Sequence, residues 1–447
     1  MGLVRFRKGY RLQYLRMCLV AGMLLSGFAV RAQMGEGFDA SLVKVWNNLD
    51  LDRKYHVGLS IYDIRKKKSI FESRADNYFI PASNTKILTM YAALYFLEDY
   101  LDAAWYKVDG DSVILWGAGD PGILYPDIDS TSALVEYLHA TSKKVFFSNS
   151  HFHANRYGRG WAWDDYAEPY QCERTAFPIY GNRLWVQKKG DQFTVTPSYL
   201  TSNVKIQQDT VCTFFRSEWG ETYQFTYTAD QDTVEAEIPI AFFKNDIQYC
   251  WSEVIGKPVG FLDLDLPEDA LPVKGSLRDS LIKVMMKESD NFIAEQLLLS
   301  CSMKALRYMS DQDIIDSLLR GPLHDLKDEI QWVDGSGLSR YNLLTPRSII
   351  EVLQRIIDEK GVAYLVNMLP AGGMPGRLQN WYKGKNGTPY VFAKTGTLGN
   401  TSCLSGILVT GSGKILLFSW MNNQFMTNSS AVKSAMEKLF SYLYDHY

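Results

Sequence analysis

The sequence is poor in residues that bind metals. It contains six histidines and six cysteines, with no C-x-x-C and no H-E-x-x-H pattern. Zinc sites that can be read from a sequence rely on such spacings, and His151 and His153 have no third ligand beside them. Gly117, Gly119 and Gly122 precede no long helix, which argues against a dinucleotide-binding loop. We therefore expect neither a metal nor a cofactor.

Strong charge and long apolar segments are also missing. The net charge of −3 lacks the excess of positive charge that is typical of nucleic-acid-binding proteins. The apolar run at residues 17–30 is short for a membrane span, follows a basic start and ends in small residues. These features predict a signal peptide over residues 1–32, cut before Gln33, and an exported, periplasmic protein; the alternative is a retained anchor. Removing the segment leaves five cysteines, whose pairing the sequence leaves open.

The length of 447 residues is too great for one typical core, so several units are expected. Two strands and a helix from Ser83 to about Tyr100 predict a first unit over residues 33–100. Short β-like runs predict a β-rich insertion over residues 101–236. Helices return over residues 237–447, followed by three strands and a closing helix. We expect an α+β fold in which both termini build one antiparallel sheet with helices over it.

Ser83 and Lys86 are the leading candidates for nucleophilic catalysis. Pro81 precedes them and good helix formers follow, which predicts that a helix begins here. Residues three apart share a helix face, so the two side chains would lie together where the helix N-terminus favours negative charge. A lysine kept neutral by burial or by a second cation removes the serine proton. The spacing predicts a serine nucleophile with a lysine base.

Two further motifs give this pair its significance. Other Ser-x-x-Lys pairs begin at Ser41, Ser202, Ser280 and Ser430, so the spacing alone is not specific. The chain has one Ser-x-Asn, Ser289-Asp290-Asn291, and one Lys-Thr-Gly, Lys394-Thr395-Gly396. In this order the three motifs are the signature of penicillin-binding and class A β-lactamase serine enzymes. Taken alone, Ser289-Asp290-Asn291 also fits the N-cap of a helix that begins at Phe292.

With its secretory start and β-rich insertion, the chain resembles the class C low-molecular-mass penicillin-binding proteins, the D-alanyl-D-alanine carboxypeptidase/endopeptidase family. Residues 117–121, 160–165, 334–340 and the pair Leu369-Pro370 extend the resemblance over nearly the whole mature chain. It implies a transpeptidase/β-lactamase-like domain with a five-stranded sheet, interrupted between its first and second motifs. One departure lies after Leu369-Pro370, where the family usually shows an acid-Gly-Thr run. Here residues 371–377 contain no acid and no threonine, and they end in Arg377.

The resemblance also implies the roles of the site residues. Peptidoglycan stem peptides ending in D-Ala-D-Ala, or D-Ala cross-links, would be substrates, and β-lactams would be inhibitors. Ser83 would attack the carbonyl, Lys86 would take its proton and Ser289 would relay a proton to the leaving amine. The remaining contacts to substrate would come from Asn291, Lys394, Thr395, Gly396 and Thr397, with the N–H groups of Ser83 and Thr397 forming an oxyanion hole.

Asp165 is a further candidate, far in sequence from all three motifs. It follows Trp161 and Trp163 inside the expected insertion. Without the resemblance, Asp165 would be interpreted as an acidic residue in a surface turn, because aspartate favours turns. The resemblance implies instead that its carboxylate meets the amine of the peptide's third residue, on a loop fixed by the tryptophans.

Two alternatives to the peptidase remain open from sequence. One is a β-lactamase or esterase on the same scaffold, which differs in its deacylation rate. The other is a wall-binding protein without turnover, although all the catalytic residue types are present. The oligomeric state and the balance of carboxypeptidase and endopeptidase activity are also open.

Overall fold

The computed structural model describes residues 40–447 except 52–54, 129–131, 220–221, 243–245 and 427–428. The expected signal peptide lies outside the described residues. In the part of the chain that the structure describes, no helix combines the length and hydropathy that a membrane crossing requires. Five cysteines are described and all are free thiols in the structure, four of them buried and Cys212 exposed.

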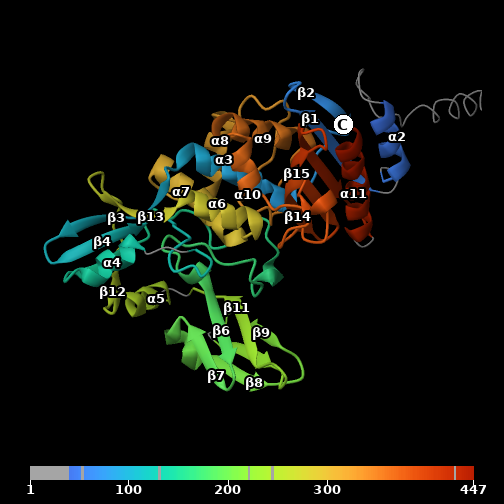
Figure 1. Cartoon of the computed structure of the whole chain (residues 1–447). Helices are drawn as coiled ribbons and strands as arrows, with labels where there is room; N and C mark the ends of the chain where they lie inside the picture. Colours follow the sequence, from blue (N-terminus) through green and yellow to red (C-terminus); the bar gives the residue numbers. More distant parts are fainter. Residues whose placement is uncertain (1–39, 52–54, 129–131, 220–221, 243–245, 427–428) are drawn as a thin grey trace, which may run out of the picture.

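The two ends of the chain share one five-stranded antiparallel sheet. The strand order is β14-β15-β16-β1-β2, so the first strand of the chain pairs with the last. Figure 1 shows these blue and red strands side by side. The bounds are β1 (His56–Asp63), β2 (Lys68–Ser73), β14 (Val391–Leu398), β15 (Thr401–Val409) and β16 (Ile415–Asn423).

Helices cover both faces of this sheet, because its central strands bury side chains on both sides. One face packs on a helical core in which α7 is buried nearly all round and is therefore central. The other face packs on α2 and α11. The bounds are α2 (Ala40–Leu49), α3 (Lys86–Phe96), α6 (Arg278–Lys287), α7 (Asn291–Leu306), α8 (Asp311–Arg320), α9 (Pro346–Lys360), α10 (Val362–Met368) and α11 (Ser429–His446).

A second five-stranded sheet follows α3, in the order β12-β5-β4-β3-β13. Its strands β12 and β13 lie beyond residue 236, so the sheet joins residues on both sides of the expected boundary. The pairings of β3 are antiparallel, whereas β4, β5 and β12 run parallel. The bounds are β3 (Tyr100–Asp109), β4 (Ser112–Gly117), α4 (Ala133–Ala140), β5 (Lys144–Ser148), α5 (Asp246–Ile255), β12 (Val259–Phe261) and β13 (Leu271–Leu277).

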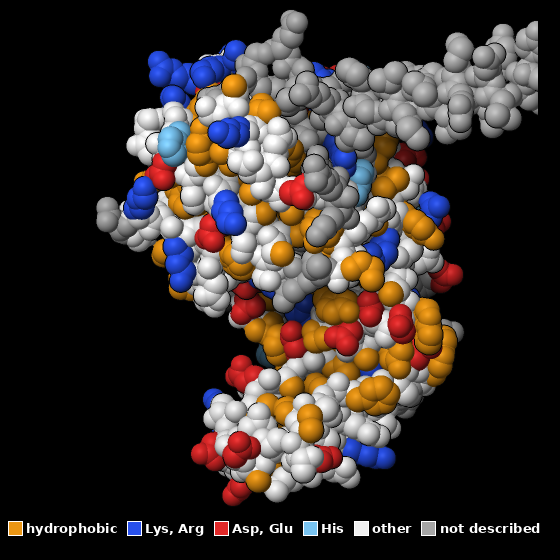
Figure 2. Space-filling model, turned by 90° about the vertical axis from the view of Figure 1, so that its right-hand side faces the viewer, with side chains coloured by type: hydrophobic (Ala, Val, Ile, Leu, Met, Phe, Trp, Pro, Cys, Tyr) orange, Lys and Arg blue, Asp and Glu red, His pale blue; other side chains and the backbone are white. Residues whose placement is uncertain are grey.

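Two three-stranded sheets form the green lower lobe of Figure 1, in the orders β11-β6-β7 and β8-β10-β9, around a small core of their own. Figure 2 shows that acidic and hydrophobic side chains gather at the narrow band above this lobe. The bounds are β6 (Arg183–Lys189), β7 (Gln192–Thr196), β8 (Val204–Gln208), β9 (Thr213–Arg216), β10 (Tyr223–Tyr227) and β11 (Thr233–Pro239).

The predicted α+β class, with a five-stranded antiparallel sheet and a β-rich insertion, is confirmed. The predicted helix after Ser83 is too long. It ends at Phe96, the next residue is extended, and Tyr100 already belongs to β3. Pairing of β3 with β13 outweighs the local helix preference at this point.

Candidate active site

A short 3-10 turn, η1 (Ala82–Thr85), carries Ser83, and α3 begins directly afterwards at Lys86. Lys86 Nζ donates a hydrogen bond of 3.0 Å to Ser83 Oγ. The predicted neighbourhood of the two side chains is therefore present, although the serine lies in a 3-10 turn before the α-helix. Gly337 packs on this turn with φ +84°, and a Cβ there would lie 2.0 Å from the Ala82 carbonyl oxygen. This close approach requires glycine.

Lys86 has no exposed surface, and its Nζ donates hydrogen bonds to three acceptors. Besides Ser83, its Nζ donates to Asn291 Oδ1 at 2.6 Å and to the Ser336 carbonyl at 2.7 Å. Burial lowers its pKa to about 8, against the opposing effect of nearby carboxylates. Roughly a tenth of a lysine with this pKa is neutral at pH 7, so a base form is available near neutrality.

A second lysine–serine pair faces the first. Lys394 Nζ donates to Ser289 Oγ at 2.8 Å and to the Thr395 carbonyl at 2.9 Å. Lys394 is fully buried, and burial and the Lys86 charge lower its pKa well below the usual range. Asn84 Nδ2 donates to the Lys394 carbonyl at 3.1 Å, which ties β14 to the turn of the candidate nucleophile. Gly396 makes this packing possible, because a Cβ there would lie 2.5 Å from the Pro81 carbonyl oxygen.

The Ser-Asp-Asn motif lies at the junction of α6 and α7, and it fits both the site and the helix-cap interpretation of its sequence. The helix begins at Asn291, one residue earlier than predicted. Asp290 is the N-cap of α7, with its Oδ1 accepting from the Ile293 N–H at 2.7 Å. Ser289 and Asn291 meanwhile contact the two lysines, and Ser289 holds an uncommon positive φ of 63°. Helix capping and the site contacts therefore coexist in the tripeptide.

The other Asp290 oxygen anchors the insertion. Its Oδ2 accepts from Tyr125 Oη at 2.6 Å and pairs with Arg183 at 3.1 Å. Burial raises the pKa of Asp290, but the Arg183 charge and the hydrogen bonds from Tyr125 and Ile293 outweigh it, leaving a net lowering. In addition, Asn291 Nδ2 donates to the Tyr170 carbonyl at 2.9 Å. The insertion therefore supports the second motif directly.

Glu295, which sequence reasoning missed, supports the candidate base from behind. Its Oε1 accepts from the Ser336 N–H at 2.7 Å, and the Ser336 carbonyl is a partner of Lys86. Its Oε2 pairs with buried Arg174 at 3.2 Å. Burial and the Asp334 charge raise the pKa of Glu295. Glu295 lies four residues after Asn291 and therefore on the same face of the helix. This spacing is the feature of the sequence that could have identified Glu295 as part of the site.

Asp165 lies in η2 (Trp163–Asp165) and lines a cavity of about 490 Å³ that also contains Asn291. The structure thus brings this distant acid to the second motif, and Arg340 lines the same cavity. Trp161 fixes the loop through a 3.0 Å hydrogen bond from its Nε1 to Asp334. Trp163, expected to do the same, is instead 76% exposed.

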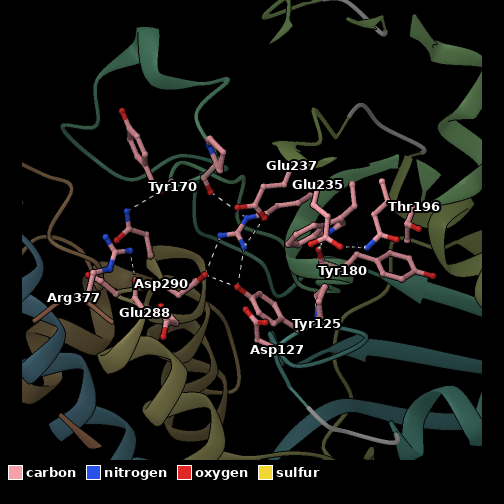
Figure 3. A pocket seen from close by; sticks show the side chains of 17 residues that line it. Tyr125, Asp127, Tyr170, Tyr180, Thr196, Glu235, Glu237, Glu288, Asp290 and Arg377 are labelled. Carbon is pink, nitrogen blue, oxygen red and sulfur yellow. Dashed lines mark hydrogen bonds and ion pairs between the residues drawn. The ribbon is translucent and has the colours of Figure 1, made fainter. Parts of the chain in front are cut away.

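Two more cavities adjoin the motifs. One of about 620 Å³ contains Ser289 and Asn291 and extends to β6, β7 and β11. Figure 3 shows Arg377, Glu288 and Asp290 on one side of it and Tyr180 and Thr196 on the other. The second, of about 240 Å³, contains the side chains of Thr395 and Thr397. In the described ranges, no group of three or more His, Cys, Asp or Glu side chains could hold a metal ion.

The sequence is similar to that of a known protein family and of two named carboxypeptidases. The sequence pattern of the D-Ala-D-Ala carboxypeptidase 3 (S13) family matches residues 40–249 and 276–443. The D-alanyl-D-alanine carboxypeptidase DacB of Haemophilus influenzae is 21% identical over 439 residues, which cover 87% of this chain and 89% of that protein. The carboxypeptidase DacB of Mycolicibacterium smegmatis is 32% identical over 151 residues, 32% of this chain and 33% of that protein.

Solved structures share the fold. The crystal structure of penicillin binding protein 4 (dacB) from Haemophilus influenzae gives a TM-score of 0.71 at 19% identity, covering 91% of this chain and 100% of that chain. A second structure of that protein, complexed with a β-lactam, gives 0.65 at 17% identity over the same shares. The predicted class C penicillin-binding resemblance is confirmed. Since the family pattern spans most of the sequence, the chain belongs to the D-Ala-D-Ala carboxypeptidase 3 (S13) family and is a serine peptidase that acts on peptidoglycan.

Proposed function

We propose that this chain is an exported, periplasmic enzyme that hydrolyses stem peptides ending in D-Ala-D-Ala, or D-Ala cross-links, through an acyl-enzyme on Ser83. The observation that carries the proposal is the facing pair of contacts, Lys86 to Ser83 at 3.0 Å and Lys394 to Ser289 at 2.8 Å. One lysine lies beside the nucleophile and the other beside a second hydroxyl. This arrangement suits one proton removal and one proton delivery.

In the proposed reaction, Ser83 Oγ attacks the carbonyl carbon of the penultimate D-Ala and its proton passes to neutral Lys86. The N–H groups of Ser83 and Thr397 hold the oxyanion. The C–N bond then breaks, and the leaving amine takes a proton relayed through Ser289. Asn291 holds the peptide amide. Water attacks the resulting ester, releases the shortened peptide and restores the serine hydroxyl.

One experiment tests this function. The mature protein is incubated with a D-Ala-D-Ala peptide, with a cross-linked peptide dimer and with a β-lactam, and D-Ala release, dimer cleavage and acyl-enzyme lifetime are measured. Peptide hydrolysis with a long-lived β-lactam adduct is expected. Rapid turnover of the β-lactam would indicate a β-lactamase or esterase instead. Binding of the peptides without turnover or acylation would indicate a wall-binding protein.

Glu295→Gln should shift the pH dependence of β-lactam acylation to lower pH. An ionised Glu295 favours protonated Lys86, whereas the amide keeps an acceptor for the Ser336 N–H. Glu295→Ala also removes that acceptor and should slow acylation on the order of tenfold. The measurement is the acylation rate constant of each variant between pH 5.5 and 9.5. Equal slowing at every pH for Glu295→Gln would show that the residue acts only in packing.

Asp165→Asn should slow hydrolysis of peptides that carry a free side-chain amine at the third position, by about tenfold. The reason is that a carboxylate in the cavity beside Asn291 attracts an ammonium group. The measurement compares kcat/KM for peptides with a free and an acetylated amine. Acylation by a small β-lactam should change little.

Asp164→Asn is the matched control for Asp165, because it removes the neighbouring charge from an exposed side chain that does not line that cavity. If Asp165→Asn slows β-lactam acylation as much as peptide hydrolysis, Asp165 is structural. If neither reaction changes, it is a turn residue only.

A further inference from the structure

The leaving part of the substrate lies beyond Ser289, because this serine is the proposed proton donor to the leaving amine. Two cavities meet near this point. The 490 Å³ cavity contains Asp165 and Asn291, whereas the 620 Å³ cavity contains Ser289 as well as Asn291. Since Asp165 is proposed to meet the third residue of the stem peptide, the acyl part of the substrate would occupy the 490 Å³ cavity. The leaving part then extends into the 620 Å³ cavity.

One wall of the 620 Å³ cavity is a face of the sheet β11-β6-β7 in the lower lobe. Side chains two apart on a strand point to the same face, and Trp185 and Gln187 of β6 both line the cavity. The register of β11 places Glu235 opposite Gln187 and Glu237 opposite Trp185, and both acids also line the cavity. Figure 3 shows Glu235 across the cavity from Glu288. The inserted lobe therefore forms a continuous wall that faces the Ser-Asp-Asn motif.

This cavity is larger than a D-alanine leaving group requires. It reaches from Ser289 to Thr196 on β7 and has a volume of about 620 Å³. Release of D-Ala needs room for one small residue, whereas cleavage of a D-Ala cross-link releases a second peptide. Cavities of this size in other proteins hold ligands as large as a short peptide. The volume therefore fits the leaving peptide of a cross-link.

The lining of the cavity is predominantly acidic. Buried Arg183 pairs with Asp290 at 3.1 Å and with Glu237 at 3.5 Å, so these charges largely balance. Glu235 is exposed and accepts a hydrogen bond of 3.1 Å from a neutral group, the amide of Gln187. Such a lining favours a leaving peptide that carries an ammonium group. The charged lining residues are five carboxylates and two arginines: Asp127, Glu235, Glu237, Glu288, Asp290, Arg183 and Arg377.

We propose that the 620 Å³ cavity binds the leaving peptide of a cross-linked substrate and favours one that carries an ammonium group. The shared face of β6 and β11 holds this peptide, and Glu235 attracts its positive charge. The bond that breaks joins the D-Ala carbonyl carbon to the leaving nitrogen, which takes its proton through Ser289. This assignment rests on the proposed function and deepens it, because it gives the inserted lobe a choice of leaving group.

The first test narrows the cavity. Gln187→Trp places a large side chain at an exposed strand position, which accepts aromatic residues well. A cross-linked dimer and a D-Ala-D-Ala peptide with the same acyl part are compared, since they form the same acyl-enzyme. The ratio of kcat/KM for the dimer to kcat/KM for the peptide should fall about tenfold. Lys189→Trp, on the same face of β6 but outside the cavity, should leave this ratio unchanged.

The second test varies the charge. Two dimers are compared whose leaving peptides carry a free or an acetylated N-terminal amine. The parent protein should cleave the ammonium form with a kcat/KM about 2- to 5-fold higher, and Glu235→Lys should abolish this preference. Asp191→Lys changes the net charge equally at the exposed turn between β6 and β7, outside the cavity, and should retain the preference.

Several results would overturn the proposal. Gln187→Trp would contradict it by slowing both substrates equally, because the lobe would then be only structural. A preference that survives Glu235→Lys, or a parent protein that releases D-Ala but does not cleave dimers, would also overturn it. If the parent protein shows no hydrolysis or acylation, the proposed function fails. Calorimetry with the isolated leaving peptide then still decides the role of the cavity: binding that Gln187→Trp weakens supports the proposal, and any other result overturns it.

Discussion

Ser83→Ala is expected to abolish covalent labelling by a fluorescent penicillin and to reduce D-Ala release on the order of 10⁴-fold or more. The physical reason is that Ser83 Oγ is the hydroxyl within hydrogen-bond reach of the buried Lys86 amine, and alanine removes the atom that forms the ester. Labelling is followed on a denaturing gel, and D-Ala release in a coupled assay.

The control for this variant is Ser280→Ala. Ser280 and Lys283 share the three-residue spacing, but both side chains are exposed on α6. This pair therefore lacks the burial that surrounds Lys86. Ser280→Ala should therefore be labelled like the parent protein. Labelling that survives Ser83→Ala would show that another residue is the nucleophile.

Lys86→Arg should slow acylation about 10²- to 10⁴-fold on the alkaline plateau of the parent protein and should show no rise with pH, because a guanidinium does not lose its proton in proteins. In the parent protein the active form is neutral Lys86, and burial lowers its pKa to about 8. Acylation should therefore rise about tenfold per pH unit below that value and level off above it. Stopped-flow acylation of both proteins between pH 5.5 and 9.5 measures the two profiles.

The direction of the pH effect distinguishes the roles of Lys86. A lysine that acted only as a cation would lose its effect as pH rises, so acylation would fall above pH 8. Substantial acylation by Lys86→Arg would likewise exclude the lysine as base. Circular dichroism of the variant checks that the buried guanidinium, which is larger than the amine, leaves the fold intact.

Much of the fold followed from local pattern. Alternating residues near the N-terminus predicted the strand that becomes β1, and residues 415–421 were predicted as the strand that becomes β16. Their pairing produces the shared sheet. Strand β13 was not predicted, because its side chains are mostly exposed and show little apolar alternation. It is held by pairing with β3, more than 150 residues away in sequence, and such pairing leaves almost no local signal.

The features of the candidate site also divide into those that the sequence predicted and those that depend on tertiary packing. The sequence by itself determined the neighbourhood of Ser83 and Lys86, because helical geometry places residues three apart on one face. It also supplied the order of the motifs, from which the family resemblance followed. Only the tertiary structure decided that Lys86 meets Asn291, 205 residues away, that Glu295 holds the Ser336 loop, and that Arg377 lines two cavities beside the motifs. Those contacts, and the burial that lowers the Lys86 pKa, depend on how distant segments pack, and no local spacing encodes that packing.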